Sequence, residues 1–183
     1  MVKNQSQSMV RLLLVMPMLF AASILFAQKS AKDTKLITES KEAKEKFIAA
    51  DGQMSNLFSN AYAYVIFPNV GKGAIGIGGA AGNGIVYQGS KAIGKASMKQ
   101  VTVGFQWGGQ AYREVIFFEN KETLDRFKQN KIEFSAQASA VAATKGASGN
   151  VKYANGVMIF TQEKGGLMYE ASVGGQKFKY NSF

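Results

Sequence analysis

Apolar and small residues recur at steps of three and four over residues 36–61, a spacing that predicts a helical stripe packed on a core. The stripe consists of Leu36, Ser40, Ala43, Phe47, Ala50, Met54, Leu57 and Ala61. Asp51-Gly52 interrupts it, so we expect two helices, or one with a break. The other face carries mixed charges between Glu39 and Lys46. This favours core packing over a membrane-surface helix, which is usually basic on its polar side.

The next stretch, Ala61–Tyr87, is dense in glycine and predicts the centre of a sheet. Ile75 and Ile77 alternate with small residues, which indicates a strand rather than a loop. Its glycines are Gly71, Gly73, Gly76, Gly78, Gly79, Gly82 and Gly84. Glycine loses much conformational freedom on folding, so this number implies backbone that turns, bulges or lies against other backbone. Asn83-Gly84 predicts a two-residue hairpin turn.

Alternating patterns predict more strands further along the chain. Val101–Trp107 alternates, and Gly108-Gly109 is expected to turn it into a partner strand over Ala111–Phe118. Asn120 is the expected N-cap of a short helix through Phe127. Residues 132–144 are rich in Ala and Ser, and the pattern leaves strand and helix open there.

The C-terminal part predicts a meander of three strands, each introduced by a glycine-containing turn. These strands are Val157–Thr161 after Asn155-Gly156, Leu167–Val173 after Gly165-Gly166, and Gln176–Tyr180 after Gly174-Gly175. In the last of them Lys177 and Lys179 alternate with Phe178 and Tyr180, so one face is wet and one buried. The expected fold is α+β: N-terminal helices followed by a glycine-rich, curled or barrel-like antiparallel β-sheet.

The N-terminal residues predict a secretory signal. Lys3 and Arg11 precede Leu12–Ala27, an apolar run of sixteen residues, whereas a spanning helix needs about 20. We expect cleavage after Ala27, with an uncleaved membrane anchor as the alternative. The expected divisions are a signal peptide over residues 1–27, a helical lead-in over 28–60 and a β-rich domain over 61–183. The expected location is the bacterial periplasm or envelope. No cysteine is present, so neither a disulfide framework nor lipoprotein acylation is available.

Charge suggests the partner. The chain carries a net charge of +10, and removal of Lys3 and Arg11 with the signal leaves +8. Such a charge favours anionic lipid head groups or acidic polymers, and an exported chain is not expected to meet nucleic acid. Between Gly52 and Arg113 every charged residue is basic, which makes these five the candidate lipid-binding residues: Lys72, Lys91, Lys95, Lys99 and Arg113. Whether the lysines share one face stays open, as does the oligomeric state.

Chemical motifs argue against an enzyme. Gly71–Gly76 fits G-x-G-x-x-G but lacks the following helix and acidic residue of a dinucleotide site. Gly89–Ala96 approaches a phosphate-binding loop but ends in Ala96, where Ser or Thr would hold magnesium. The chain has no His and no Cys, so we expect no catalytic residue, metal site or cofactor. Glu114 and Glu170 are expected in outward or cross-strand-paired positions.

Four ordered blocks resemble the SYLF family of lipid-binding and actin-associated domains. The first runs from Ala63 to Gly84, with the pattern A-x-x-x-FP-x-V-x-KG-x-x-G-x-GG-x-x-G-x-G, and the others are Val103–Phe118, Phe127–Phe134 and Glu163–Phe178. The resemblance covers the chain from about Phe58 onward. It implies kinship with phosphoinositide binders that remodel membranes, some of which bind actin filaments, but it maps no binding residue onto this chain. We therefore expect an exported domain that binds anionic lipid, with a cell-envelope protein-interaction module as the alternative.

Overall fold

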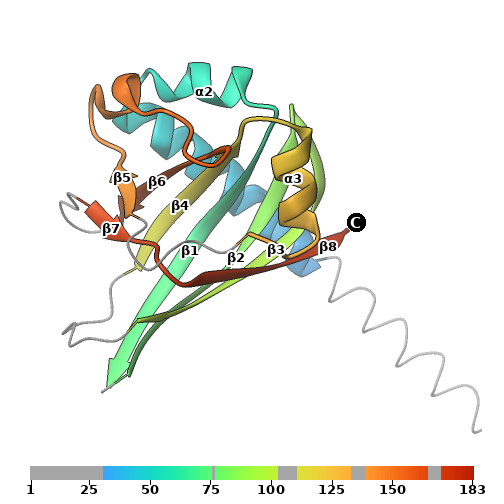
Figure 1. The fold of residues 1–183 in the computed structure, drawn as a ribbon, viewed down its shortest axis with the longest axis vertical. Helices are drawn as coiled ribbons and strands as arrows, with labels where there is room; N and C mark the ends of the chain where they lie inside the picture. The colour runs from blue at the N-terminus through green and yellow to red at the C-terminus, as the bar shows by residue number, and fades with distance from the viewer. Residues whose placement is uncertain (1–30, 76, 103–110, 133–138, 165–169) are drawn as a thin grey trace, which may run out of the picture. The chain divides into compact units, whose positions relative to one another are not determined.

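The computed structural model describes residues 31–75, 77–102, 111–132, 139–164 and 170–183. The chain divides into two compact units, Met1–Lys35 and Leu36–Phe183. In the first unit the described residues 31–35 are helical. The second unit combines helices with one large sheet (Figure 1), which confirms the α+β class.

The helical stripe breaks where the sequence predicts. Residues 36–50 are helical, and α2 spans Met54–Asn60. Between them the Asp51 side chain accepts a hydrogen bond of 3.1 Å from the Gln53 amide, which stabilises the turn. The stripe is buried against the sheet, which confirms its core-packing role; its enclosed members are Ser40, Ala43, Phe47 and Met54, joined by Phe58.

Eight strands form one sheet in the described part of the chain. They are β1 Ala63–Ile75, β2 Ile77–Gln88, β3 Lys91–Thr102, β4 Ala111–Phe118, β5 Ser139–Ala142, β6 Val157–Glu163, β7 Glu170–Ser172 and β8 Gln176–Ser182. Their order is β7-β5-β6-β4-β1-β2-β3-β8. Only β5 and β6 pair in parallel among the described strands. The remaining elements are α3, Lys121–Lys128, and the short 3-10 helix η1, Ala147–Asn150.

The sheet is strongly curled but does not close. Its two edge strands, β7 and β8, are joined only by Val173–Gly175. Such a link spans at most about 14 Å, whereas a flat sheet would separate these edges by about 33 Å. No ladder joins β7 to β8 in the described residues. The expected curl is therefore present, and the barrel-like alternative is wrong as far as closure is concerned.

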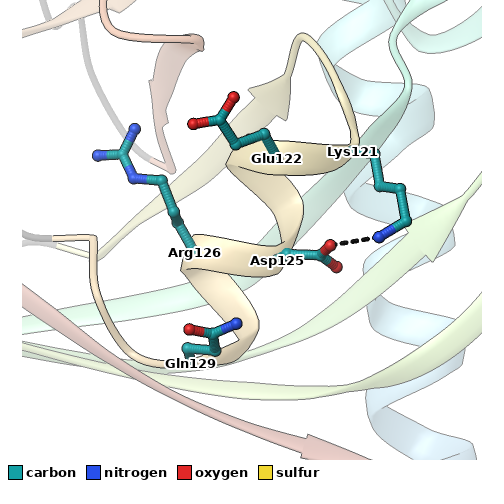
Figure 2. A pocket seen from close by; sticks show the side chains of 5 residues that line it. All are labelled: Lys121, Glu122, Asp125, Arg126 and Gln129. Carbon is teal, nitrogen blue, oxygen red and sulfur yellow. Dashed lines mark hydrogen bonds and ion pairs between the residues drawn. The ribbon is translucent and has the colours of Figure 1, made fainter.

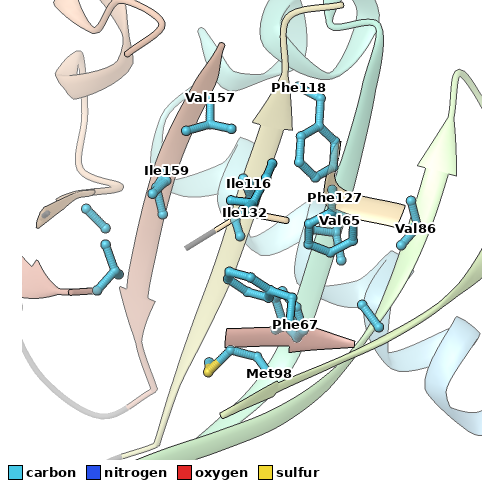
Figure 3. Close-up of a cluster of buried hydrophobic side chains, with 14 of the residues drawn as sticks. Val65, Phe67, Val86, Met98, Ile116, Phe118, Phe127, Ile132, Val157 and Ile159 are labelled. Carbon is cyan, nitrogen blue, oxygen red and sulfur yellow. The ribbon is translucent and has the colours of Figure 1, made fainter. Parts of the chain in front are cut away.

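Curling gives the sheet two distinct faces. The inner face is concave and covered by α3, and its core includes Val65, Phe67, Phe118 and Phe127 (Figure 3). Phe178 of β8 reaches across this core to Phe67 of β1, with ring centroids 6.0 Å apart. The outer face is covered by the 36–50 helix and α2 over a second core; this core includes Phe47, Phe58, Tyr64, Tyr87 and Phe117.

The predicted hairpin turn at Asn83-Gly84 is wrong. β1 ends at Ile75 and pairs antiparallel with β2, which begins at Ile77, and both Asn83 and Gly84 lie within β2, each paired to β3. A Cβ on Gly84 would lie 2.5 Å from the carbonyl oxygen of Ile66. This glycine is therefore needed for close approach of two backbones rather than for a turn.

Strand pairing also differs from the predictions. Ala111–Phe118 is not the partner of the strand that begins at Val101, because β4 lies between β1 and β6; residues 103–110 lie outside the described residues. The C-terminal meander is wrong as well, since β7 pairs with β5 and β8 pairs with β3. Asn120 caps α3 as predicted, its side chain accepting a 2.9 Å hydrogen bond from the Thr123 amide.

Candidate functional site

Four lysines lie on the outer face of the sheet along β3 and β8. We call this set, Lys95, Lys99, Lys177 and Lys179, the lysine ladder. Lys99 and Lys177 are directly opposite each other in the register, and Lys179 is opposite Ser97. Lys99, Lys177 and Lys179 are exposed, and Lys95 is half-buried.

Alternation along the two strands directs these side chains outward. The intervening residues face the inner core and are buried, namely Ala96, Met98 and Gln100 on β3 and Gln176 and Phe178 on β8. Because each inner side chain is packed, its lysine neighbours are held on the opposite face. The ladder therefore rests on two strands anchored from within.

The ladder concentrates like charge. Side chains directly opposite on antiparallel strands have Cβ atoms about 5 Å apart, and like charges there are destabilising. The sequences of β1, β2, β3 and β8 contain no Asp or Glu. Lys99 and Lys177 therefore place two positive charges on facing strands, where one anion could contact both of them.

The structure brings together only part of the predicted site. Lys95 and Lys99 share the ladder. Lys91 follows the turn at Gly89-Ser90, and the alternation that sends Ala92 toward the outer core places Lys91 on the other side. Lys72 lies on β1 opposite Ala80, two strands from β3.

Arg113 has a different environment from the ladder. Its guanidinium donates to Gln162 Oε1 at 3.3 Å, and Gln162 Nε2 donates to the Lys46 carbonyl at 3.3 Å. This chain of bonds joins β4 and β6 to the 36–50 helix. Burial lowers the pKa of Arg113. The contacts indicate a structural role for this residue.

Sequence reasoning missed Lys177 and Lys179 as site residues. It predicted their wet face, which is confirmed, but nothing local indicates that β8 pairs with β3. The available signal was the spacing itself: lysines two apart in one strand and four apart in another fall on a single face of each.

A buried polar cluster lies on the inner face beneath β8. Gln176 Nε2 donates a 2.9 Å hydrogen bond to Glu114 Oε2, and Gln100 Nε2 donates a 3.0 Å bond to the Gly174 carbonyl. Glu114 is fully buried, so the predicted outward position is wrong. Burial and the neighbouring Glu114 raise the pKa of Tyr112. These contacts tie β8 to β4, and β3 to the link that precedes β8, across the curled sheet.

Aromatic residues can anchor a protein at a membrane interface, but most of the tyrosines in this sheet belong to the core. Tyr64, Tyr87 and Tyr112 are buried, whereas Tyr62 is partly buried and Trp107 lies outside the described residues. Burial raises the pKa of Tyr64 to about 12. The Tyr87 hydroxyl forms a short hydrogen bond with Ser40 of the 36–50 helix. Lys44 of the same helix donates to the Tyr64 hydroxyl, so Tyr64 and Tyr87 join that helix to the sheet.

A surface pocket of about 450 Å³ lies over α3 (Figure 2). Its lining residues are Lys121, Glu122, Asp125, Arg126 and Gln129. Lys121 and Asp125 form an ion pair of 2.5 Å one helical turn apart. The mixed charges are typical of a solvated helix face. In the described chain, no group of three or more carboxylate, His or Cys side chains is placed to hold a metal ion.

Among the described residues, no helix combines the length and the apolar character that a membrane-crossing helix needs.

Comparison with known proteins identifies the domain. A family described as Ysc84, Las17-binding protein actin regulator, matches residues 99–182. This range begins at Lys99 of the ladder and extends through β8. Three of the four sequence blocks noted above fall within it. The glycine-rich block precedes it.

A curated relative, beta cell expansion factor A of Aeromonas veronii, is 30% identical over 125 residues. The alignment covers 67% of this chain and 47% of that protein, so the chain spans about half the length of this relative. Both comparisons confirm the resemblance to SYLF domains. Through residues 99–182, the chain belongs to the Ysc84 (SYLF) family.

Proposed function

We propose that this protein is an exported, non-enzymatic domain that binds anionic lipid head groups through the lysine ladder. The observation that carries the proposal is the placement of Lys99 opposite Lys177 on an exposed sheet face, with Lys95 and Lys179 beside them. Membership of a family of lipid-binding or actin-associated modules supports it. The basic charge of the chain favours the same class of partner.

The expected strength follows from the number of lysines. Each basic residue near an anionic surface contributes about 1 kcal/mol. Four of them contribute about 4 kcal/mol, which is roughly a thousandfold in partitioning. Added salt reduces this attraction, because the Debye length falls to about 8 Å at physiological ionic strength. The attachment is therefore reversible.

Vesicle co-sedimentation tests the proposal. The mature chain expected after cleavage, Gln28–Phe183, is incubated with neutral or anionic phospholipid vesicles at low and at high salt, alongside a Lys99→Ala/Lys177→Ala variant. Lys145→Ala/Lys152→Ala is the matched control, since both of these lysines are exposed and lie outside the ladder. We expect salt-sensitive binding to anionic vesicles that falls about thirtyfold in the first variant and stays nearly unchanged in the second. Equal losses in both variants would mean that net charge, not the ladder, governs binding.

Protein interaction at the cell envelope is the competing function. It predicts contact through apolar surface and therefore binding that persists at high salt. Absence of vesicle binding under every condition would contradict the lipid proposal and favour this alternative.

A further inference from the structure

Phe183 is an apolar side chain exposed beside the lysine ladder. It is 57% exposed and is the large hydrophobic residue that stands out to solvent in the described chain. Lys177, Lys179 and Asn181 occupy successive outer-face positions on β8, and Phe183 continues that alternation. Lys95 Nζ lies 6.0 Å from the centroid of the Phe183 ring. The ring therefore lies on the same face as the ladder.

A single exposed apolar side chain is common on proteins and by itself indicates nothing. Here its position matters, because the cation that contacts the ring belongs to a row of basic residues. Lysine ammonium groups remain among lipid head groups while their stems and a neighbouring aromatic ring enter the apolar side of the interface. The ladder and Phe183 together have this arrangement.

The direction of the ladder limits how a flat surface can meet it. Lys95 and Lys99 are four positions apart along β3, a distance of about 13 Å at the rise of a strand. All four ammonium groups reach one plane only when β3 and β8 lie along that plane. The inner face and α3 then point away from it.

We infer that β3 and β8 lie flat on an anionic bilayer, with Phe183 entering the interface as an apolar anchor. This inference rests on the proposed function and adds the docking orientation. It also adds a contribution to affinity that salt does not screen. The lysines supply the salt-sensitive part of the affinity, and Phe183 supplies the salt-resistant part.

Substitution of Phe183 separates the two contributions. We expect Phe183→Ala to weaken binding to anionic phosphatidylglycerol-containing vesicles about three- to tenfold. The salt dependence should stay unchanged, and Phe183→Leu should retain most of the affinity. The Lys99→Ala/Lys177→Ala variant should instead show a weaker salt dependence, because two of the four ladder lysines remain. An unchanged affinity in Phe183→Ala would overturn the anchor.

Fluorescent probes test the orientation directly. The chain contains no cysteine, so single substitutions Asn181→Cys, Gln129→Cys and Asn60→Cys each accept one environment-sensitive fluorophore. Asn181 lies on the ladder face, Gln129 follows α3 on the other side of the sheet, and Asn60 ends α2; all three are exposed. We expect a blue shift and protection from an aqueous quencher on anionic vesicles at position 181 only.

The outcomes distinguish the two proposals. Vesicle binding with the response at position 129 or 60 instead of 181 overturns the flat orientation and leaves lipid binding intact. If the protein sediments with vesicles but no fluorophore responds, the face that carries the lysine ladder does not enter the bilayer interface, and the inferred orientation is wrong. Failure to sediment with any vesicle overturns both proposals.

Discussion

Gln176 on β8 donates a hydrogen bond to Glu114 on β4, although three strands lie between β4 and β8 in the sheet. The bond crosses the inside of the curled sheet and does not follow the backbone pairing from strand to strand. It connects a buried carboxylate to the strand that carries Lys177 and Lys179. The outer lysine row therefore depends on a polar contact on the opposite face.

Removal of the amide donor should destabilise the domain. Gln176→Met has a similar shape but leaves Glu114 without this hydrogen bond. We expect the free energy of unfolding to fall by about 1.5–3 kcal/mol, because the lost hydrogen bond is made to the buried carboxylate of Glu114. Urea denaturation measures the change. Lys177→Ala, on the exposed side of the same strand, should stay within about 0.5 kcal/mol; similar losses in both variants would contradict the role of the inner contact.

Asp51 should make stability depend on pH. Burial opposes its ionisation, but hydrogen bonds from the Ser148 side chain and backbone and from Gln53 outweigh burial, so the pKa of Asp51 lies below its usual value. A lowered pKa gives stability that is present above the unfolded value of about 3.9 and is lost as pH falls through the folded value.

Asp51→Asn should therefore lower the free energy of unfolding by about 1–3 kcal/mol at neutral pH. The difference in the free energy of unfolding between this variant and the natural chain should disappear at acidic pH. Urea denaturation across a pH series measures this. A gap that stays constant from neutral to acidic pH would show that the charge of Asp51 contributes nothing.

Two glycines offer a matched test of close packing. In Gly84→Ala the new methyl group would lie 2.5 Å from the Ile66 carbonyl oxygen and 2.8 Å from Phe67 Cδ1, so we expect a loss of about 1–3 kcal/mol. In Gly71→Ala nothing lies within 4 Å, and the reduced freedom of the unfolded chain should leave stability equal or up to about 1 kcal/mol higher. Thermal denaturation of both variants decides; equal melting temperatures would contradict the packing argument.

The Lys99–Lys177 pair predicts opposite effects on stability and binding. Lys99→Glu gives Lys177 an opposite charge on the facing strand, so stability at low salt should rise by about 0.2–1 kcal/mol. Binding to anionic vesicles should fall sharply. Melting temperature and co-sedimentation are measured on the same sample, with Lys152→Glu as the charge-matched control. If Lys99→Glu gains stability but keeps its affinity for anionic vesicles, the lysine ladder does not bind lipid.

Local patterns predicted the elements that depend on near neighbours. The stripe through Ala43 and Phe47, the break at Asp51-Gly52 and the cap at Asn120 each involve residues within a few positions of one another. The alternation of Lys177 with Phe178 likewise follows from a single strand.

These local patterns could not predict which strands pair when the strands lie far apart in the sequence. Asn83-Gly84 has the composition of a turn, yet Gly84 is there because the backbone of Ile66 lies against it, and Ile66 belongs to another strand. Similarly, β8 joins β3 because Phe178 reaches Phe67 and Phe127 inside the curl. The site inherits this difficulty, since Lys99 and Lys177 meet only through that pairing.

The three-residue link between β7 and β8 has a consequence for the order of assembly. Because the link is so short, β7 and β8 can reach their two edges only in a curled sheet, and β8 must also pair with β3, which lies far earlier in the chain. Contacts between segments so distant in sequence form slowly, because chain entropy opposes them. A nascent or partly folded chain therefore keeps its basic residues dispersed. The attraction for a charged surface becomes concentrated only in the finished fold, so affinity for such a surface reports that folding is complete.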